Sequence, residues 1–187
     1  GICLYTAIYE PLQRTQKAPI LMTRTPYKAS PYGKKFNNRL WGIWKKYAHE
    51  KYIFVIQDVR GRWKSEGKFI NVTKQDDTDE ASDVYDTAEW LLAHTHNNGN
   101  IGIIGSSYSG FYALMGALSK HPAIQSLIIF SADSGTVFRS VSSQRSLNMP
   151  PFRTGNISRF LNLSKNAMPM RRADAWKNIF TEVCATF

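Results

Sequence analysis

The stretch NIGIIGSSYSG, residues 100–110, joins an apolar run to a cluster of glycine and serine. Residues 100–106 are typical of a strand that is buried on both faces, as in a parallel sheet. Residues 108–120 are mostly apolar and predict a helix that ends before His121-Pro122, because proline disfavours a helical residue before it. A strand that passes into a helix through such a turn is the setting of a nucleophile elbow, which presents a reactive serine.

Of the three serines in the turn, Ser107 fits this setting best. Strand and helix nearly touch at an elbow, so small residues are needed two places before the nucleophile and two and three places after it. Around Ser107 these places hold Gly105, Ser109 and Gly110. Either of the other serines would put Ile104 or Phe111 into one of them. The spacing is G-x-S-x-x-G and not the commoner G-x-S-x-G, so an ordinary turn with a helix-capping serine is the alternative.

Strand-like and helix-like patterns alternate over the first two thirds of the chain. Apolar or alternating runs predict strands at residues 3–9, 19–25, 52–58, 100–106 and 125–132. Amphipathic patterns predict helices at residues 37–50, 78–93 and 108–120, with Thr78 as a candidate N-cap. This alternation predicts an α/β fold with a mostly parallel, doubly wound sheet.

The pattern changes after Asp133. Residues 135–187 contain no convincing strand, whereas residues 156–168 and 173–183 have helical patterns. We therefore expect residues 1–134 to form the N-terminal part of an α/β domain, and residues 135–187 to begin a helical cap region.

Composition excludes several classes of protein. The net charge is +10, but the basic residues are scattered and form no run or single-face stripe, which disfavours a nucleic-acid-binding protein. Seven of the fourteen acids fall within residues 76–89, which contain no Lys or Arg. No apolar run is long enough to span a bilayer. Cys3 and Cys184 lie at opposite ends of the chain without metal-ligand spacing, so we expect two isolated thiols and no metal or cofactor.

Four stretches together resemble the family of α-amino acid ester hydrolases, cocaine esterases and X-Pro dipeptidyl-peptidases. They are LMTRTPYK, IQDVRGRWKSEGKF, TDEASDVYDTAEWL and NGNIGIIGSSYSGF, in this order between about residues 4 and 122. The resemblance implies an α/β-hydrolase fold, incomplete in these residues. It also implies a serine hydrolase that cleaves ester or amide bonds in small molecules or short peptides.

The resemblance also implies roles for individual residues. Ser107 would attack the acyl carbonyl and form an acyl-enzyme. The backbone N–H of Tyr108 and the phenol of Tyr27 would stabilise the oxyanion. Asp133 would lie on the substrate side and bind an ammonium group, although the Asp-Asp-Trp stretch expected after it is absent. Asp58, Arg60 and Gly61 would be architectural.

The histidine that should activate the serine is not evident. In this fold the order is serine, acid, histidine, and we interpret the four histidines as surface or loop residues: His49, His94, His96 and His121. The acid and base are expected beyond residue 187, which makes residues 1–187 an N-terminal fragment without activity of its own. A non-catalytic binding module with this fold is the alternative. The resemblance favours a periplasmic or secreted location over a cytoplasmic one.

Overall fold

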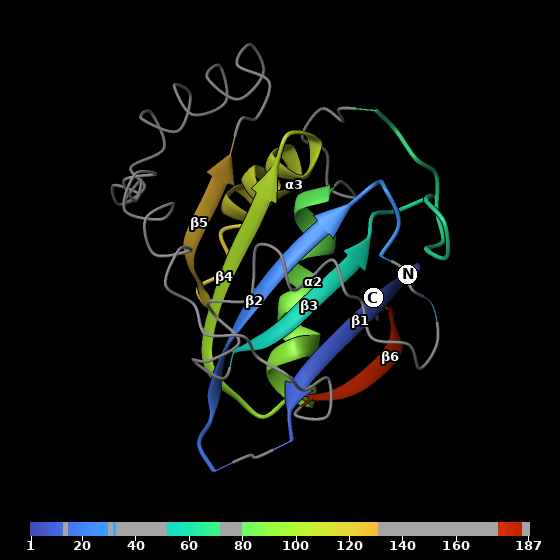
Figure 1. The fold of residues 1–187 in the computed structure, drawn as a ribbon. Helices are drawn as coiled ribbons and strands as arrows, with labels where there is room; N and C mark the ends of the chain where they lie inside the picture. The colour runs from blue at the N-terminus through green and yellow to red at the C-terminus, as the bar shows by residue number, and fades with distance from the viewer. Residues whose placement is uncertain (13–14, 30–31, 33–51, 72–79, 131–175, 185–187) are drawn as a thin grey trace, which may run out of the picture.

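The computed structural model describes residues 1–12, 15–29, 32, 52–71, 80–130 and 176–184 (Figure 1). Several predictions fall outside these residues and are not tested by it. They concern the helices at residues 37–50 and 156–168, the cap at Thr78, the histidine at His49, the carboxylate at Asp133 and the domain boundary at residue 134.

Six strands form one sheet in the order β5-β4-β2-β3-β1-β6. Their bounds are β1 Cys3–Pro11, β2 Ala18–Thr25, β3 Ile53–Asp58, β4 Asn97–Ser106, β5 Ile124–Phe130 and β6 Trp176–Cys184. The pairs β2–β3, β2–β4 and β4–β5 are parallel, whereas β1 runs antiparallel to both β3 and β6. The first five strands agree with the predicted ranges to within a few residues, and the mostly parallel α/β sheet is confirmed.

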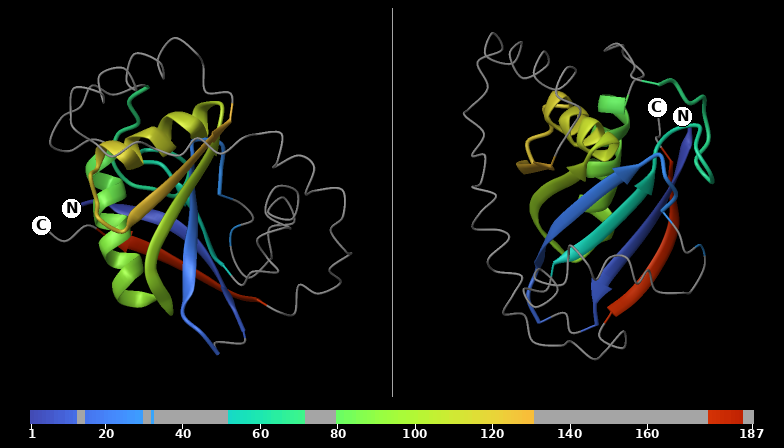
Figure 2. Two further views of the ribbon diagram at one scale, coloured as in Figure 1. Left: turned by 90° about the vertical axis from the view of Figure 1, so that its left-hand side faces the viewer. Right: turned by 45° about the horizontal axis from the view of Figure 1, so that its top comes forward.

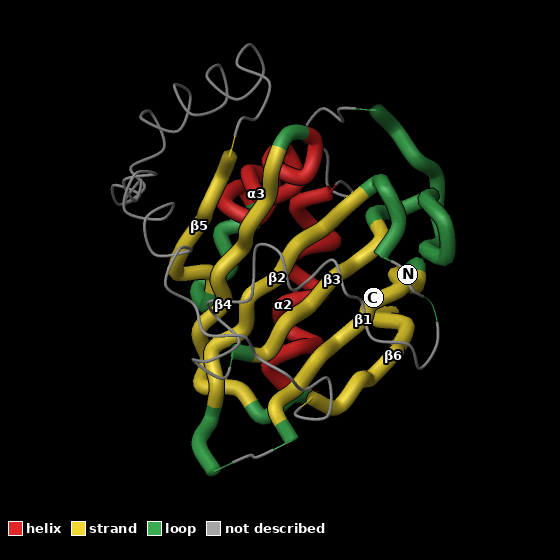
Figure 3. Tube along the Cα trace, viewed as in Figure 1, coloured by secondary structure: helices red, strands yellow, loops and turns green. Residues whose placement is uncertain are grey.

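Two helices, α2 (Glu80–His94) and α3 (Tyr108–Leu118), cover one face of this sheet (Figures 1 and 3). The left view of Figure 2 shows both on the same side of the twisted strands. A core cluster joins Val84, Ala88 and Leu91 of α2 to buried β-branched residues of the central strands. Burying a valine, leucine or isoleucine side chain of this cluster contributes roughly 1.5–3 kcal/mol. Neither helix is long and apolar enough to cross a membrane, within the part of the chain that the structure describes.

The prediction of helix for residues 173–183 is wrong, because Trp176–Cys184 forms the edge strand β6. This strand pairs with β1 over its whole length, from Cys3 opposite Cys184 to Pro11 opposite Trp176. The segment IFTEV is rich in residues that favour strands, and pairing with a distant partner overrides a local helical spacing. This stretch therefore belongs to the sheet and not to a helical cap.

The expectation of two isolated thiols is also wrong. Cys3 and Cys184 form a disulfide between β1 and β6. The two residues are 181 positions apart in sequence, so spacing could not reveal the bond. It follows from the register of the two strands, which places the residues directly opposite each other.

Candidate active site

Ser107 occupies the junction between β4 and α3, as predicted. β4 ends at Ser106, α3 begins at Tyr108, and Ser107 between them has φ 51° and ψ −122°. A positive φ costs a residue with a side chain on the order of 1–3 kcal/mol and is concentrated at functional sites. The hydroxyl of Ser107 makes no capping hydrogen bond to α3, and the residue is exposed. The side chain of Ser107 therefore does not cap the helix, which was the alternative interpretation.

Gly105 explains how the turn can be so tight. A Cβ atom on Gly105 would overlap the backbone carbonyl of Ser109 and lie 2.7 Å from the backbone nitrogen of Gly110. These are backbone atoms of the first turn of α3, so they cannot rotate away. The steric argument that singled out Ser107 therefore holds in the structure, while the chemical role of Ser107 stays a prediction.

Tyr27 and Tyr108 approach each other beside this turn. β2 ends at Thr25, and Tyr27, two residues later, is 65% exposed, with its N–H donating to Thr25 Oγ1 at 3.0 Å. The rings of Tyr27 and Tyr108 lie edge to face with centroids 6.3 Å apart. The Tyr108 hydroxyl donates to Asn71 Oδ1, a contact that the sequence did not suggest. Because β2 and β4 are parallel neighbours, their carboxyl ends bring Tyr27 and the Ser107 turn to one edge of the sheet.

The loop after β3 fixes the segment that carries Tyr27. Trp63 Nε1 donates to the carbonyl oxygen of Pro26 at 2.9 Å, and Arg62 Nε donates to the same oxygen at 3.3 Å. Gly61 has φ 66°, and a Cβ atom there would overlap the backbone of Phe69. Gly61 is therefore architectural, as expected. The contribution of Arg62 and Trp63 was not anticipated.

Asp58 at the end of β3 holds the chain that follows Tyr27. Its Oδ1 accepts from the Ala29 N–H at 2.6 Å, and its Oδ2 accepts from the Tyr32 hydroxyl at 2.7 Å. Burial raises the pKa of Asp58, although these hydrogen bonds and the nearby charge of Lys28 oppose the shift. Burial and the hydrogen bond to Asp58 raise the pKa of Tyr32 as well. Asp58 thus has the structural part expected of it.

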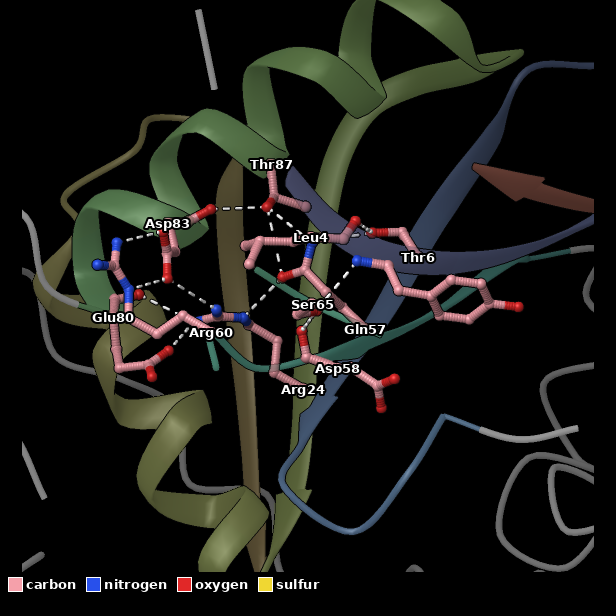
Figure 4. Close-up of polar contacts among 11 residues, drawn as sticks. Leu4, Thr6, Arg24, Gln57, Asp58, Arg60, Ser65, Glu80, Asp83 and Thr87 are labelled. Carbon is pink, nitrogen blue, oxygen red and sulfur yellow. Dashed lines mark hydrogen bonds and ion pairs between the residues drawn. The ribbon is translucent and has the colours of Figure 1, made fainter. Parts of the chain in front are cut away.

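A buried ionic network links β2, α2 and the loop after β3 (Figure 4). Arg24 is completely buried, and its guanidinium donates to Gln57 Oε1 at 2.7 Å and to the Glu80 carbonyl oxygen at 2.9 Å. The same guanidinium pairs with Glu80 Oε2 at 2.9 Å and Asp83 Oδ2 at 3.4 Å. Arg60 pairs with both oxygens of Asp83. The acidic stretch at residues 76–89 therefore does more than face solvent, since two of its carboxylates anchor α2 to β2 and to the loop after β3.

Gln57 and Thr87 extend this network across the sheet. Gln57 Nε2 donates to Thr6 Oγ1 and to Thr87 Oγ1, both at 3.0 Å, and Thr87 Oγ1 donates to the Asp83 carbonyl oxygen at 2.6 Å. The network thus joins β1, β3 and α2 (Figure 4). Local sequence patterns could not show it, because its members come from four separate segments.

Glu80 and Tyr112 connect the network with the Ser107 helix. Burial raises the pKa of Glu80, against the opposing effect of Arg24. The Arg24 guanidinium carbon lies 5.9 Å from the centroid of the Tyr112 ring, and that ring contacts Tyr108 edge to face at 5.3 Å. A packed series of side chains therefore runs from the end of β2 to the residue after Ser107.

His121 lies in the loop between α3 and β5, as one of the two expected alternatives, but it is not a surface residue. Its side chain is fully buried, with Nδ1 accepting from the Ala123 N–H at 3.1 Å and Nε2 lying 2.8 Å from Glu89 Oε1. This arrangement requires the proton on Nε2, which donates to Glu89. His121 follows the C-terminal end of α3, whereas Ser107 precedes its N-terminal end, a helix length of about 16 Å away at 1.5 Å per residue. Among the described residues, no three potential metal ligands gather into a site.

A family model of X-Pro dipeptidyl-peptidases (S15 family) matches residues 1–184. The cocaine esterase of Rhodococcus sp. (strain MB1 Bresler) is 32% identical over 123 residues, which are 64% of this chain and 19% of that protein. The chain therefore spans about a fifth of the length of this relative.

Solved structures of related proteins also match part of this chain. An aminopeptidase from a marine sediment archaeon, Thaumarchaeota archaeon, superposes with a TM-score of 0.60 at 35% identity, over 68% of this chain and 23% of its own. A selenomethionine-labelled α-amino acid ester hydrolase superposes with a TM-score of 0.59 at 34% identity, over 68% of this chain and 22% of its own. The described sheet and helices match part of an α/β-hydrolase fold.

Proposed function

This chain belongs to the X-Pro dipeptidyl-peptidase (S15) family of serine hydrolases, and from that premise we propose that Ser107 is the nucleophile of an enzyme that cleaves ester or amide bonds. One observation carries the proposal. Ser107 is an exposed residue with a left-handed backbone at a strand-to-helix turn, and its hydroxyl makes no capping hydrogen bond. A strained, exposed hydroxyl of this kind is suited to attack a bound carbonyl carbon.

The negative charge that develops on the carbonyl oxygen needs hydrogen-bond donors. Tyr108 is the first residue of α3, so its N–H has no acceptor within the helix and points toward the turn that holds Ser107. We assign this N–H and the phenol of Tyr27 to the oxyanion. The 6.3 Å approach of the Tyr27 and Tyr108 rings supports the assignment. Each such donor is worth about 10²–10³ in rate.

The proton of the Ser107 hydroxyl must pass to a base as Oγ bonds to the acyl carbon. The alcohol or amine then leaves with that proton, and water hydrolyses the acyl-enzyme. His121 lies at the opposite end of α3 and is occupied by Glu89 and Ala123. We therefore propose that the histidine and its acid are supplied by residues outside 1–187, in a longer chain. Asp133, which follows β5, is proposed to face the substrate.

The small esters, amides or short peptides that this family implies are the proposed substrates. The test is labelling of the full-length protein by a fluorophosphonate, which reacts with activated serines. Labelling should disappear in Ser107→Ala and persist in Ser106→Ala and Ser109→Ala, which remove neighbouring hydroxyls of the same turn. Labelling that survives Ser107→Ala, or disappears in Ser106→Ala, would contradict the assignment. A folded protein that is never labelled would favour a non-catalytic binding module.

A further inference from the structure

Backbone strain gathers at the same edge of the sheet as Ser107. Within the described residues, four that are not glycine have a positive φ: Lys28 at 90°, Trp63 at 54°, Ser107 at 51° and Lys120 at 55°. The first two flank the segment that carries Tyr27, whereas Lys120 lies after the far end of α3. Strain of this kind persists only where the surroundings impose it, and it is concentrated at ligand-binding and catalytic sites.

Trp63 is held in place but is not buried. Its indole N–H donates to the Pro26 carbonyl oxygen at 2.9 Å, yet 56% of the residue is exposed. A tryptophan that packs into a core hides its ring, so this side chain gains little from burial. Trp63 therefore presents an exposed aromatic side chain beside the segment that carries Tyr27.

Three cationic side chains are stacked on the rings around this surface. Lys28 Nζ lies 5.3 Å from the Trp63 ring centroid and 5.2 Å from that of Tyr32. Arg62 lies over Trp63 at 5.8 Å, and Lys64 lies over Tyr32 at 4.8 Å. The attraction between a cation and the face of an aromatic ring favours a defined place for each of these charges.

The acids nearest these charges have other partners in the fold, although Asp58 offsets part of the charge of Lys28. Asp58 is buried and accepts hydrogen bonds from Ala29 and Tyr32, and Glu66 accepts from the Cys3 N–H at 2.8 Å. The ion pairs found among the described residues involve Arg24, Arg60 and His121, and none involves the three stacked cations. Among the described residues, the surface next to Tyr27 therefore combines an exposed aromatic side chain with three basic side chains that form no ion pair.

We infer that Trp63, Lys28, Arg62 and Lys64 form a subsite for a carboxylate attached to an aromatic ring. The ring packs against the exposed part of the Trp63 side chain, and the carboxylate meets Lys28, which lies near both the Trp63 and the Tyr32 ring. The subsite reaches Ser107 through a short series of contacts, from Trp63 to Pro26, Tyr27 and Tyr108. The role of this subsite in substrate selection rests on the proposed hydrolase function. Because its side chains are basic, the subsite disfavours a substrate that places an ammonium group there.

Binding of benzoate tests the subsite without any need for turnover. Benzamide has the same shape but no charge, and both can be titrated calorimetrically into the full-length protein at low salt. Benzoate should bind at least about tenfold more tightly than benzamide. Lys28→Gln should weaken benzoate binding about fivefold, the size expected for one exposed ionic contact, and leave benzamide binding unchanged. Trp63→Leu should weaken both.

Lys120→Gln is the matched control, because Lys120 also has a positive φ but lies away from the subsite. It should change neither affinity. Equal binding of benzoate and benzamide, or equal losses in Lys120→Gln and Lys28→Gln, would overturn the subsite. Benzoate should also slow fluorophosphonate labelling of Ser107, and binding without protection would overturn the link between subsite and nucleophile. Benzoate binding with the expected pattern in a protein that is never labelled would keep the subsite and reject the hydrolase.

Discussion

Arg60 holds Asp83 through two parallel hydrogen bonds, from Nε to Oδ2 at 2.7 Å and from Nη2 to Oδ1 at 2.6 Å. Asp83 is buried in the first turn of α2, and Arg60 belongs to the loop after β3. The pair thus fixes the acidic helix to the loop whose next residues hold Pro26. Arg24 also pairs with Asp83, with Nη2 3.4 Å from Oδ2, so one carboxylate binds two guanidinium groups.

Replacing Arg60 by lysine should destabilise the protein by about 1–3 kcal/mol. Lysine keeps the charge but cannot form two parallel bonds, so it leaves part of a buried carboxylate without a donor. Arg62→Lys, two residues along the same loop, is the control and should cost about 0.5 kcal/mol. Urea unfolding of both variants measures the difference. Equal losses of unfolding free energy in the two variants would mean that the two parallel hydrogen bonds to Asp83 add no stability.

Asp86 gives a prediction about pH. Burial and the neighbouring Asp83 raise its pKa above the usual value of about 3.9, with Arg60 partly opposing them. The folded state then holds this proton more tightly than the unfolded state, so the contribution of Asp86 to stability falls as pH rises through the interval between the two pKa values. Asp86→Asn should therefore stabilise the protein at pH 7 by about 0.5 kcal/mol, because it removes a partly buried charge and its repulsion from Asp83.

The gain in Asp86→Asn should vanish below about pH 4, where Asp86 is protonated in both states. Urea unfolding between pH 3 and pH 8 follows the difference from the unsubstituted protein. If the stability gain of Asp86→Asn were the same at every pH in this range, ionisation of Asp86 would not be its cause.

Local patterns in the sequence predicted the elements and the elbow well. The apolar runs located the first five strands, and the spacing of Val84, Ala88 and Leu91 identified the buried face of α2. Gly105 could be interpreted from sterics alone, because its neighbours along the chain are also its neighbours in space.

Features that depend on distant pairing could not be found in this way. Arg24 meets its acidic partners across more than fifty residues, and an acidic run that contains no basic residue looks like a solvated surface. The disulfide and β6 depend on a register between the two ends of the chain. The loop position of His121 could be predicted from the proline that follows it, but its burial and its contact with Glu89 of α2 could not.

Gly105→Ala should open the turn at Ser107. The added methyl would overlap the backbone of Ser109, and overpacking of this kind costs about 1–3 kcal/mol or more. Gly102→Ala is the control on the same strand, because its Cβ would meet the Ser126 hydroxyl at 2.8 Å, a side chain that can rotate. Melting temperature and fluorophosphonate labelling should both fall in Gly105→Ala and change little in Gly102→Ala. Equal behaviour would show that the turn tolerates a larger residue.

The bond between Cys3 and Cys184 should appear as a cross-linked peptide when the unreduced protein is digested. Replacing both residues by serine should lower stability by roughly 2–4 kcal/mol, because the bond closes a long loop in the unfolded chain. The unsubstituted protein under reducing conditions is the control and should match the variant. Recovery of both residues as free thiols from protein kept under oxidising conditions would contradict the pairing.

Tyr27→Phe tests the second oxyanion donor. The substitution removes one hydroxyl and keeps a ring that can still meet Tyr108 edge to face. If the phenol donates only to the charge that develops in the transition state, kcat should fall about 10²–10³-fold with little change in KM. Tyr85→Phe removes an exposed hydroxyl from α2 and should leave both constants unchanged. Steady-state kinetics on an activated ester compares the two variants in the full-length protein, with circular dichroism as the check on folding.

An unchanged kcat in Tyr27→Phe would remove the phenol from the mechanism and leave the Tyr108 N–H without its proposed partner. A rise in KM alone would instead make Tyr27 a residue that binds substrate and transition state equally.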